Sequence, residues 1–264
     1  MKNQPIGVFD SGIGGLTILR ALRRTLPHEN LIYFGDTANV PYGGKSKAAV
    51  TRLALNVARF LEDQGVKLVI VACNTASAQA LNTLRKNLKV PVLGVIEPGA
   101  DAAVHATKNN RIAVLGTQGT VESGAYVKAI KKRLRKAQVF QQACPLFVPL
   151  AEEGFADKPA AKLIACEYLQ PVKASRADTV ILGCTHYPIL KSLIAQILGS
   201  HVTLVDSADT LAHATKQFLQ DKKLATISGR GRIKLYASDT PQKFTCSAQK
   251  LLGEKTIRAI LKKV

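Results

Sequence analysis

Short apolar runs alternate with longer segments of helical periodicity along most of the chain. Short apolar runs are typical of buried strands, and apolar residues that recur every three or four positions are typical of amphipathic helices. We expect strands over 6–9, 31–35, 68–72, 92–95, 111–116, 138–143, 179–183 and 203–205. We expect helices over 16–25, 46–64, 76–88, 99–107, 122–136, 158–169, 188–199 and 207–220. This alternation predicts an α/β fold with mainly parallel sheets.

The order of these segments contains a weak internal repeat. Residues 6–12 parallel 112–118, and a cysteine-bearing segment follows each of them, at 68–75 and at 179–186. We therefore expect two similar α/β lobes with the active site in the cleft between them. Residues 1–97 with 208–264 would form the first lobe, which carries Cys73, and 98–207 the second, which carries Cys184. A packed helix that returns to the first lobe is expected from the C-terminal apolar residues Leu251, Leu252, Ile257, Ile260, Leu261 and Val264.

Composition places the chain among ordinary globular proteins. It has 264 residues, 47% of them hydrophobic, enough to bury a sizeable core. No apolar stretch approaches the ~20 residues that span a bilayer, and no signal-peptide hydrophobic region precedes the first expected strand. Five cysteines without framework spacing suit free thiols. The expected location is the cytoplasm, away from any membrane.

The net charge is the unusual property of the composition. Lys and Arg number 37 against 18 Asp and Glu, a formal charge of +19 that would attract anionic partners. In the densest basic segment, 128–136, Ile130 and Leu134 fall at the spacing of an amphipathic helix with a solvated basic face. The basic residues are dispersed, and no zinc-finger or RNP signature is present. A solvated surface is favoured, and nucleic-acid binding stays open as the alternative.

Asp10, Cys73, Thr117 and Cys184 each follow an expected strand directly. Ligands of open parallel sheets bind beyond the carboxyl ends of the strands, so we expect these side chains to converge on one crevice between the lobes. A free cysteine is most often a small buried hydrophobe. That interpretation is kept for the other three cysteines, whereas the matched settings of Cys73 and Cys184 favour chemistry.

Three kinds of chemistry suit these two thiols. Cys184 and His186 are both zinc-ligand types, but no Cys-x₂-Cys or second histidine lies nearby. A redox disulfide would lack the compact Cys-x-x-Cys pattern. Acid–base catalysis fits better, because one thiolate can remove a proton from a carbon while an opposing thiol supplies another on the opposite face. The sulfurs should then lie roughly 6–8 Å apart with substrate between them.

Two loops offer further candidates. Asp10 opens the glycine-rich segment 11–15, whose backbone N–H groups could cradle an anion, although a tight turn alone also explains the glycines. Asp10 itself could hold an ammonium group, assist Cys73 or cap a helix. The segment Pro41-Tyr42-Gly43 is a turn by composition.

Two groups could act on Cys184. His186 follows it by two residues and could relay protons, although a lone histidine is more often only hydrogen-bonded. Glu152 and Glu153 would ordinarily be solvated or capping residues, and a catalytic role is the alternative.

Five motifs resemble those of the glutamate racemases, cofactor-independent bacterial enzymes that supply D-glutamate for peptidoglycan in the cell wall. The motifs are 7–16, 41–43, 72–77, 148–154 and 182–188. The related aspartate racemases carry an acidic residue where His186 stands, which favours glutamate as the substrate. The chain also lacks the N-terminal extension through which some relatives respond to a cell-wall precursor, so no such activation is expected.

The resemblance implies two α/β lobes, neither pyridoxal phosphate nor a metal, and a small-molecule substrate, L- or D-glutamate. It implies that Cys73 acts on D-glutamate with the help of Asp10, and that Cys184 acts on L-glutamate with the help of His186 and Glu152. The implied substrate-binding residues are Asp10, Ser11, Pro41, Tyr42, Gly43, Asn74, Thr75, Thr117, Thr185 and His186. A homodimer is the default expectation for the oligomeric state.

Overall fold

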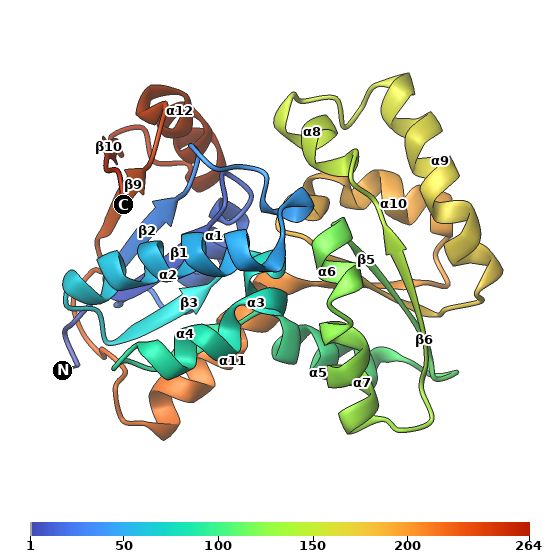
Figure 1. The fold of residues 1–264 in the computed structure, drawn as a ribbon, viewed down its shortest axis with the longest axis horizontal. Coiled ribbons are helices and arrows are strands. Elements are labelled where there is room, and N and C mark those ends of the chain that lie inside the picture. The colour runs from blue at the N-terminus through green and yellow to red at the C-terminus, as the bar shows by residue number, and fades with distance from the viewer. Residues whose placement is uncertain (1) are drawn as a thin grey trace.

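A computed structural model describes residues 2–264 as two lobes, each built on a parallel sheet (Figure 1). The first sheet has the order β10-β9-β2-β1-β3-β4. Its strands are β1 (Ile6–Asp10), β2 (Leu31–Gly35), β3 (Leu68–Val71), β4 (Val92–Gly94), β9 (Ile233–Ala237) and β10 (Ala259–Leu261). The second sheet has the order β6-β5-β7-β8. Its strands are β5 (Arg111–Gly116), β6 (Gln138–Ala143), β7 (Thr179–Gly183) and β8 (Thr203–Asp206).

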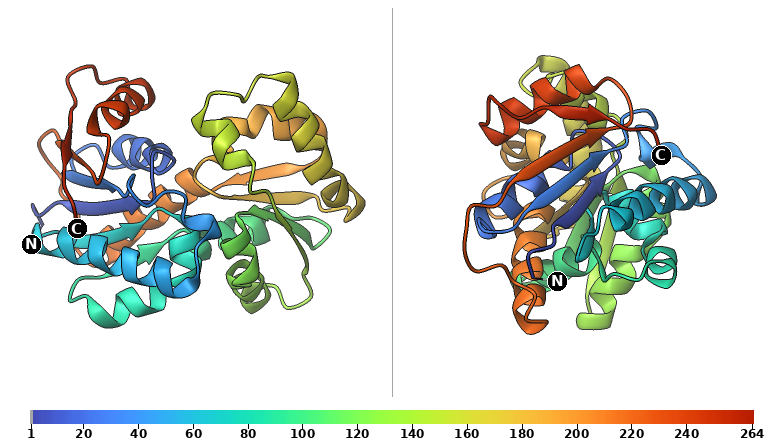
Figure 2. Two further views of the ribbon diagram at one scale, coloured as in Figure 1. Left: turned by 45° about the horizontal axis from the view of Figure 1, so that its top comes forward. Right: turned by 90° about the vertical axis from the view of Figure 1, so that its left-hand side faces the viewer.

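Helices cover both sheets, and the left view of Figure 2 shows the two lobes side by side. The first lobe carries α1 (Leu16–Thr25), η1 (Tyr42–Gly44), α2 (Lys47–Asp63), α3 (Asn74–Gln79), α4 (Leu81–Asn87) and α12 (Pro241–Leu252). The second carries α5 (Ile96–Ala106), α6 (Gln118–Glu122), α7 (Ala125–Arg133), α8 (Phe147–Glu152), α9 (Pro159–Ala174), η2 (Tyr187–Leu190) and α10 (Lys191–Leu198). Helix α11 (Ser207–Asp221) packs against both α1 and α5. Within residues 2–264, every helix is too short or too polar to cross a bilayer.

The hydrophobic core follows from the alternation of side chains along the strands. On β1, Ile6 and Val8 face α1 and α11, whereas Phe9 faces α2 and α3. The core on the α11 side continues into the second lobe, where it includes Val114 and Ile181. One continuous apolar layer therefore joins the lobes, and the other two faces have separate cores.

The strand order repeats between the lobes. The order β2-β1-β3-β4 in the first sheet corresponds to β6-β5-β7-β8 in the second, and all these pairings are parallel. In each lobe the strand that ends in a cysteine loop, β3 or β7, lies directly beside the first strand of that lobe. The expectation of two similar α/β lobes is confirmed. The division into 1–97 with 208–264 and 98–207 stays a prediction, since α11 contacts both lobes.

Several expected elements differ from the observed ones. The helix expected over 76–88 is two helices that meet at Ala80, and the helix expected over 122–136 is interrupted by Gly124 in a left-handed conformation with φ 61°. The C-terminal segment returns to the first lobe, as expected, but the packed helix expected there includes only Leu251 and Leu252, and the helix was wrong for the residues after them. Helix α12 ends at Leu252, left-handed Gly253 follows it, and residues 259–261 form a strand beside β9.

Candidate active site

A cavity at the seam between the lobes is lined by both Cys73 and Cys184. Its volume is about 20 Å³, which is room for a water molecule and too little for an amino acid. The cavity lies at the carboxyl ends of the strands, where ligands of parallel sheets bind. Its lining residues are Ser11, Pro41, Tyr42, Gly43, Cys73, Asn74, Thr75, Thr117, Val148, Cys184, Thr185 and His186.

The cavity brings together most of the residues expected from the sequence. Of the candidate site residues, only Asp10 and Glu152 are absent from the lining, and each contacts a residue that lines it. Val148 was missed. It is an apolar residue of α8 and only its place in the motif 148–154 could have pointed to it.

Cys73 is buried at the start of α3. It is 5% exposed, and its Sγ donates a hydrogen bond to Ser11 Oγ at 3.9 Å. Burial, reinforced by the nearby Asp10 carboxylate, raises the pKa of the Cys73 thiol well above its ordinary value. Cys73 is therefore held in its protonated form.

The glycine-rich loop surrounds Asp10. The Asp10 Oδ2 atom accepts hydrogen bonds from the backbone N–H groups of Gly15 at 2.9 Å and Gly12 at 3.3 Å. Thr185 Oγ1 of the second lobe lies 3.4 Å from Oδ1. Burial raises the pKa of Asp10, against the lowering effect of His186 and of these amides. The anion that these amides hold is thus the carboxylate of Asp10 itself.

Cys184 faces a charged pair. His186 Nδ1 lies 3.8 Å from Cys184 Sγ, and His186 Nε2 lies 2.9 Å from Glu152 Oε1. Burial alone would lower the pKa of His186, but the hydrogen bonds with Cys184 and Glu152 outweigh it and raise the pKa to about 10. The hydrogen bond with His186 lowers the pKa of Glu152. At neutral pH, His186 is therefore an imidazolium, and it lies 3.8 Å from the Cys184 sulfur.

A second buried carboxylate, Asp36, holds Tyr42. Asp36 accepts hydrogen bonds from Tyr42 Oη at 2.6 Å, Ser238 Oγ at 2.7 Å and Asn39 Nδ2 at 3.0 Å. Sequence reasoning missed Asp36, although it follows β2 directly, as Thr117 follows β5. Ser238 directly follows β9. Through Asp36 it is linked to Tyr42, which lines the cavity.

Hydroxyl and amide groups connect the lobes across the seam. Thr75 Oγ1 and Thr117 Oγ1 lie 2.8 Å apart, and Tyr126 Oη donates to Asn74 Oδ1 at 2.8 Å. A Cβ atom at Gly43 would lie only 2.6 Å from Thr117 Cβ. The seam is therefore closely packed around the cavity.

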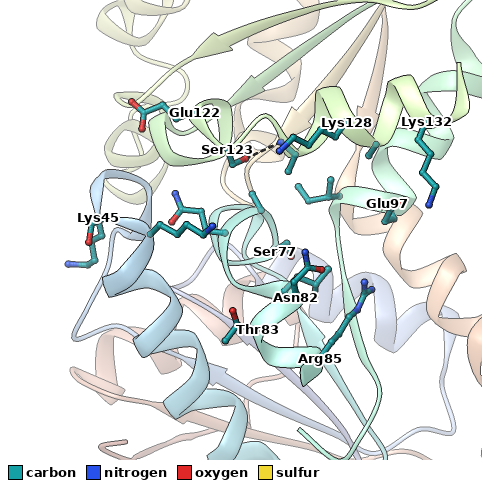
Figure 3. A pocket seen from close by; sticks show the side chains of 18 residues that line it. Lys45, Ser77, Asn82, Thr83, Arg85, Glu97, Glu122, Ser123, Lys128 and Lys132 are labelled. Atoms are coloured by element: carbon teal, nitrogen blue, oxygen red, sulfur yellow. Dashed lines mark hydrogen bonds between the residues drawn. The ribbon is translucent and has the colours of Figure 1, made fainter. Parts of the chain in front are cut away.

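A larger pocket, of about 590 Å³, lies away from the cysteines (Figure 3). Side chains of α4, α5 and α7 surround it, with others from the start of α2 and from α3 and α6. Its basic residues are Lys45, Lys47, Arg85, Lys128 and Lys132, and its acidic residues are Glu97 and Glu122. No cysteine lines it, so size alone does not locate the reactive groups.

The chain is similar to known racemases over nearly its whole length. The family described as Asp/Glu/Hydantoin racemase matches residues 14–215. A glutamate racemase of Geobacter metallireducens is 49% identical over 256 residues, which cover 97% of this chain and 95% of the relative.

Solved structures agree with this similarity. The glutamate racemase isoform RacE1 of Bacillus anthracis has a TM-score of 0.97 at 36% identity and covers 100% of this chain and 99% of its own. A Francisella tularensis glutamate racemase, solved with D-glutamate, has a TM-score of 0.92 at 39% identity and covers 100% of this chain and 98% of its own. The chain therefore belongs to the Asp/Glu/Hydantoin racemase family, and it is an amino-acid racemase of the glutamate racemase type.

Proposed function

We propose that Cys73 and Cys184 are the two acid–base groups with which this enzyme interconverts L- and D-glutamate. One observation carries the proposal: both cysteines line the same cavity, and they reach it from equivalent strands, β3 and β7, of opposite lobes. An α-carbon held between them would have one sulfur on each face. The similarity to the Francisella tularensis enzyme, solved with D-glutamate, supports glutamate as the substrate.

In the L-to-D direction, the Cys184 thiolate removes the α-proton of L-glutamate and becomes a thiol. The electron pair of the broken C–H bond stays on the α-carbon and its carboxylate. The Cys73 thiol then donates its proton to the other face, which gives D-glutamate and leaves Cys73 as the thiolate. The charges around the sulfurs support this order, because the His186 imidazolium lies beside Cys184 and Cys73 is held as a thiol.

The reverse direction uses the same groups with exchanged roles. The Cys73 thiolate removes the α-proton of D-glutamate, and the Cys184 thiol supplies the new proton. Asp10 supports the Cys73 side and His186, held by Glu152, supports the Cys184 side. We propose that Ser11, Thr75, Thr117 and Thr185 bind the polar groups of glutamate, together with Asn74 and the turn Pro41-Tyr42-Gly43.

The biological role follows from the product. D-Glutamate made by this enzyme would supply peptidoglycan synthesis for the cell wall from within the cytoplasm. All five cysteines are free in the structure, which suits a reducing compartment. A homodimer remains a prediction, as does the absence of nucleic-acid binding.

Replacement of each cysteine by serine tests the two-thiol mechanism. Cys73→Ser and Cys184→Ser should each lower kcat about 10²- to 10⁴-fold, because a serine hydroxyl is a far weaker acid than a thiol and supplies almost no anionic base at neutral pH. The measurement is loss of optical rotation from L-glutamate with no added cofactor, and in deuterated water turnover should place deuterium on the α-carbon. Cys246→Ser, at an exposed cysteine, is the control and should keep the wild-type rate. Full activity of either active-site variant would refute the mechanism.

A further inference from the structure

Asn74 carries a hydrogen-bond donor that nothing in the protein satisfies. Asn74 is 2% exposed and lines the cavity, and its Nδ2 atom is buried without a hydrogen-bond partner. Buried polar atoms in proteins are nearly always paired. An unpaired amide nitrogen at the wall of an active-site cavity therefore points to a partner that arrives with the substrate.

The other end of the Asn74 amide is held by the second lobe. Tyr126 Oη donates a hydrogen bond to Asn74 Oδ1 at 2.8 Å. Tyr126 is fully buried, and burial raises its pKa, so the phenol keeps its proton at any working pH. Because the oxygen of the amide is engaged, its two N–H groups are directed away from Tyr126.

Close packing holds the Tyr126 ring in place. A Cβ atom at Gly99 would lie 3.3 Å from Tyr126 Cε1 and from its Oη. A Cβ atom at Gly183, directly before Cys184, would lie 3.1 Å from Tyr126 Cε2. The phenol ring is thus packed against the end of β7, the strand that directly precedes Cys184.

We propose that Tyr126 is a positioning residue: it orients the Asn74 amide across the seam so that Nδ2 donates to a carboxylate of the bound amino acid. The acceptor must be a carboxylate, because the ammonium group of an amino acid can only donate hydrogen bonds. This inference rests on the proposed function. The inference adds that Asn74, a residue of the first lobe, is oriented toward the substrate by Tyr126 of the second lobe.

Tyr126→Phe removes the hydroxyl and keeps the ring. KM for both enantiomers should rise about tenfold, the loss expected for one hydrogen bond to a charged group, with a smaller fall in kcat. The pH profile should stay unchanged. In an Asn74→Ala background, Tyr126→Phe should have no further effect on KM, because the residue through which it acts is gone.

Tyr236→Phe is the matched control. Tyr236 is 6% exposed, and its hydroxyl also donates to an amide oxygen, Gln64 Oε1 at 3.3 Å, in the first lobe and away from the cavity lining. It should leave KM at the wild-type value. A second variant, Asn74→Asp, keeps the acceptor for Tyr126 but replaces the free N–H₂ group with an oxygen, so KM should rise more than tenfold. Circular dichroism at the assay temperature checks that this variant is folded, since a new buried carboxylate lowers stability.

Three results would overturn the proposal: a wild-type KM for Tyr126→Phe, a wild-type KM for Asn74→Asp, or additive effects of Tyr126→Phe and Asn74→Ala. If Tyr126→Phe does not fold, the Asn74→Asp result decides. Failure of the proposed function would look different, since wild-type protein would then leave the rotation of L-glutamate unchanged.

Discussion

Charged groups of opposite sign lie near the two active-site sulfurs. On the Cys73 side, burial and the Asp10 carboxylate raise the pKa of the thiol. On the Cys184 side, His186 lies 3.8 Å from the sulfur and carries a proton up to about pH 10. In the proposed L-to-D reaction, Cys73 begins as the acid and Cys184, beside the His186 imidazolium, begins as the base.

Removal of the Glu152 charge should shift the alkaline limit of activity. Glu152→Gln takes away one of the two hydrogen-bonded groups that raise the pKa of His186 to about 10. The alkaline fall of kcat/KM, expected near pH 10 in the wild type, should therefore move to lower pH. Glu153→Gln changes the neighbouring, exposed glutamate and should leave the profile unmoved. An identical alkaline limb in Glu152→Gln would show that His186 does not control it.

The same residues link stability to pH. The folded-state pKa of His186 lies above the ordinary value of about 6.5, so the stabilisation from its protonated form is complete below about pH 6.5 and is lost as pH rises through about 10. Unfolding free energies measured over this range should fall less in Glu152→Gln than in the wild type.

Single residues were predictable from the sequence where local context marked them. The two cysteines stood out because the same apolar run precedes each. Asp36 was missed although it follows an expected strand directly, and Tyr126 carried no local mark; their partners Ser238 and Asn74 are distant in sequence. Only the packing of separate elements brings those polar groups together.

At the scale of elements, the loop before α1 determines how closely the lobes approach. A Cβ atom at Gly14 would lie 2.6 Å from His186 Nδ1 and closer still to Thr185 Oγ1. Thr17 Oγ1, one turn further on, donates to Gly14 O at 2.8 Å, and Thr185 O lies 3.4 Å from it. A glycine is required here for the close approach of the second lobe.

A single methyl group should therefore disturb the closed seam. Gly14→Ala should lower kcat/KM at least about tenfold, because overpacking by one carbon costs about 1–3 kcal/mol and falls here on the Cys184 side of the cavity. Steady-state kinetics and thermal melting measure the two effects. Gly44→Ala is the control, since a Cβ atom at Gly44 would meet nothing within 4 Å. Equal activity of the two variants would contradict the assigned role of the loop.

Strands were predictable from the sequence where all of their residues are buried. Buried strands such as β1 and β3 read as short apolar runs, and their expected bounds differ from the observed ones by one residue at one end. The C-terminal strand β10 gives no such signal, because Ile260 and Leu261 are 48% and 51% exposed at the edge of the sheet. Their apolar spacing imitates a helix, which explains the wrong expectation there.

At the scale of the whole molecule, one buried ion pair joins distant parts of the first lobe. Lys67 Nζ lies 2.6 Å from Glu29 Oε2, and both side chains are almost fully buried. Lys67 Nζ also donates to Leu224 O at 2.8 Å and to Thr226 Oγ1 at 3.2 Å, in the segment after α11. The pair therefore connects the chain that returns from the second lobe with the strands β2 and β3.

Loss of Lys67 should destabilise the protein strongly. Lys67→Met leaves the Glu29 carboxylate buried without its cation, and the free energy of unfolding should fall by about 3–5 kcal/mol. Denaturant unfolding followed by circular dichroism measures the change. Arg24→Met breaks the exposed Arg24–Asp209 pair and should change stability by less than about 1 kcal/mol. Similar effects of the two substitutions would argue against a special role for the buried pair.

The repeated strand order puts the two cysteines in equivalent positions, yet different groups surround them. Mirror-image amino acids have the same free energy in water, so the equilibrium constant of the reaction is unity whatever catalyses it. The ratio kcat/KM must then be the same for L-glutamate as for D-glutamate, in the wild type and in every variant. The different surroundings of the two cysteines can therefore change kcat and KM for each enantiomer separately. They cannot change the ratio of kcat/KM values between the enantiomers.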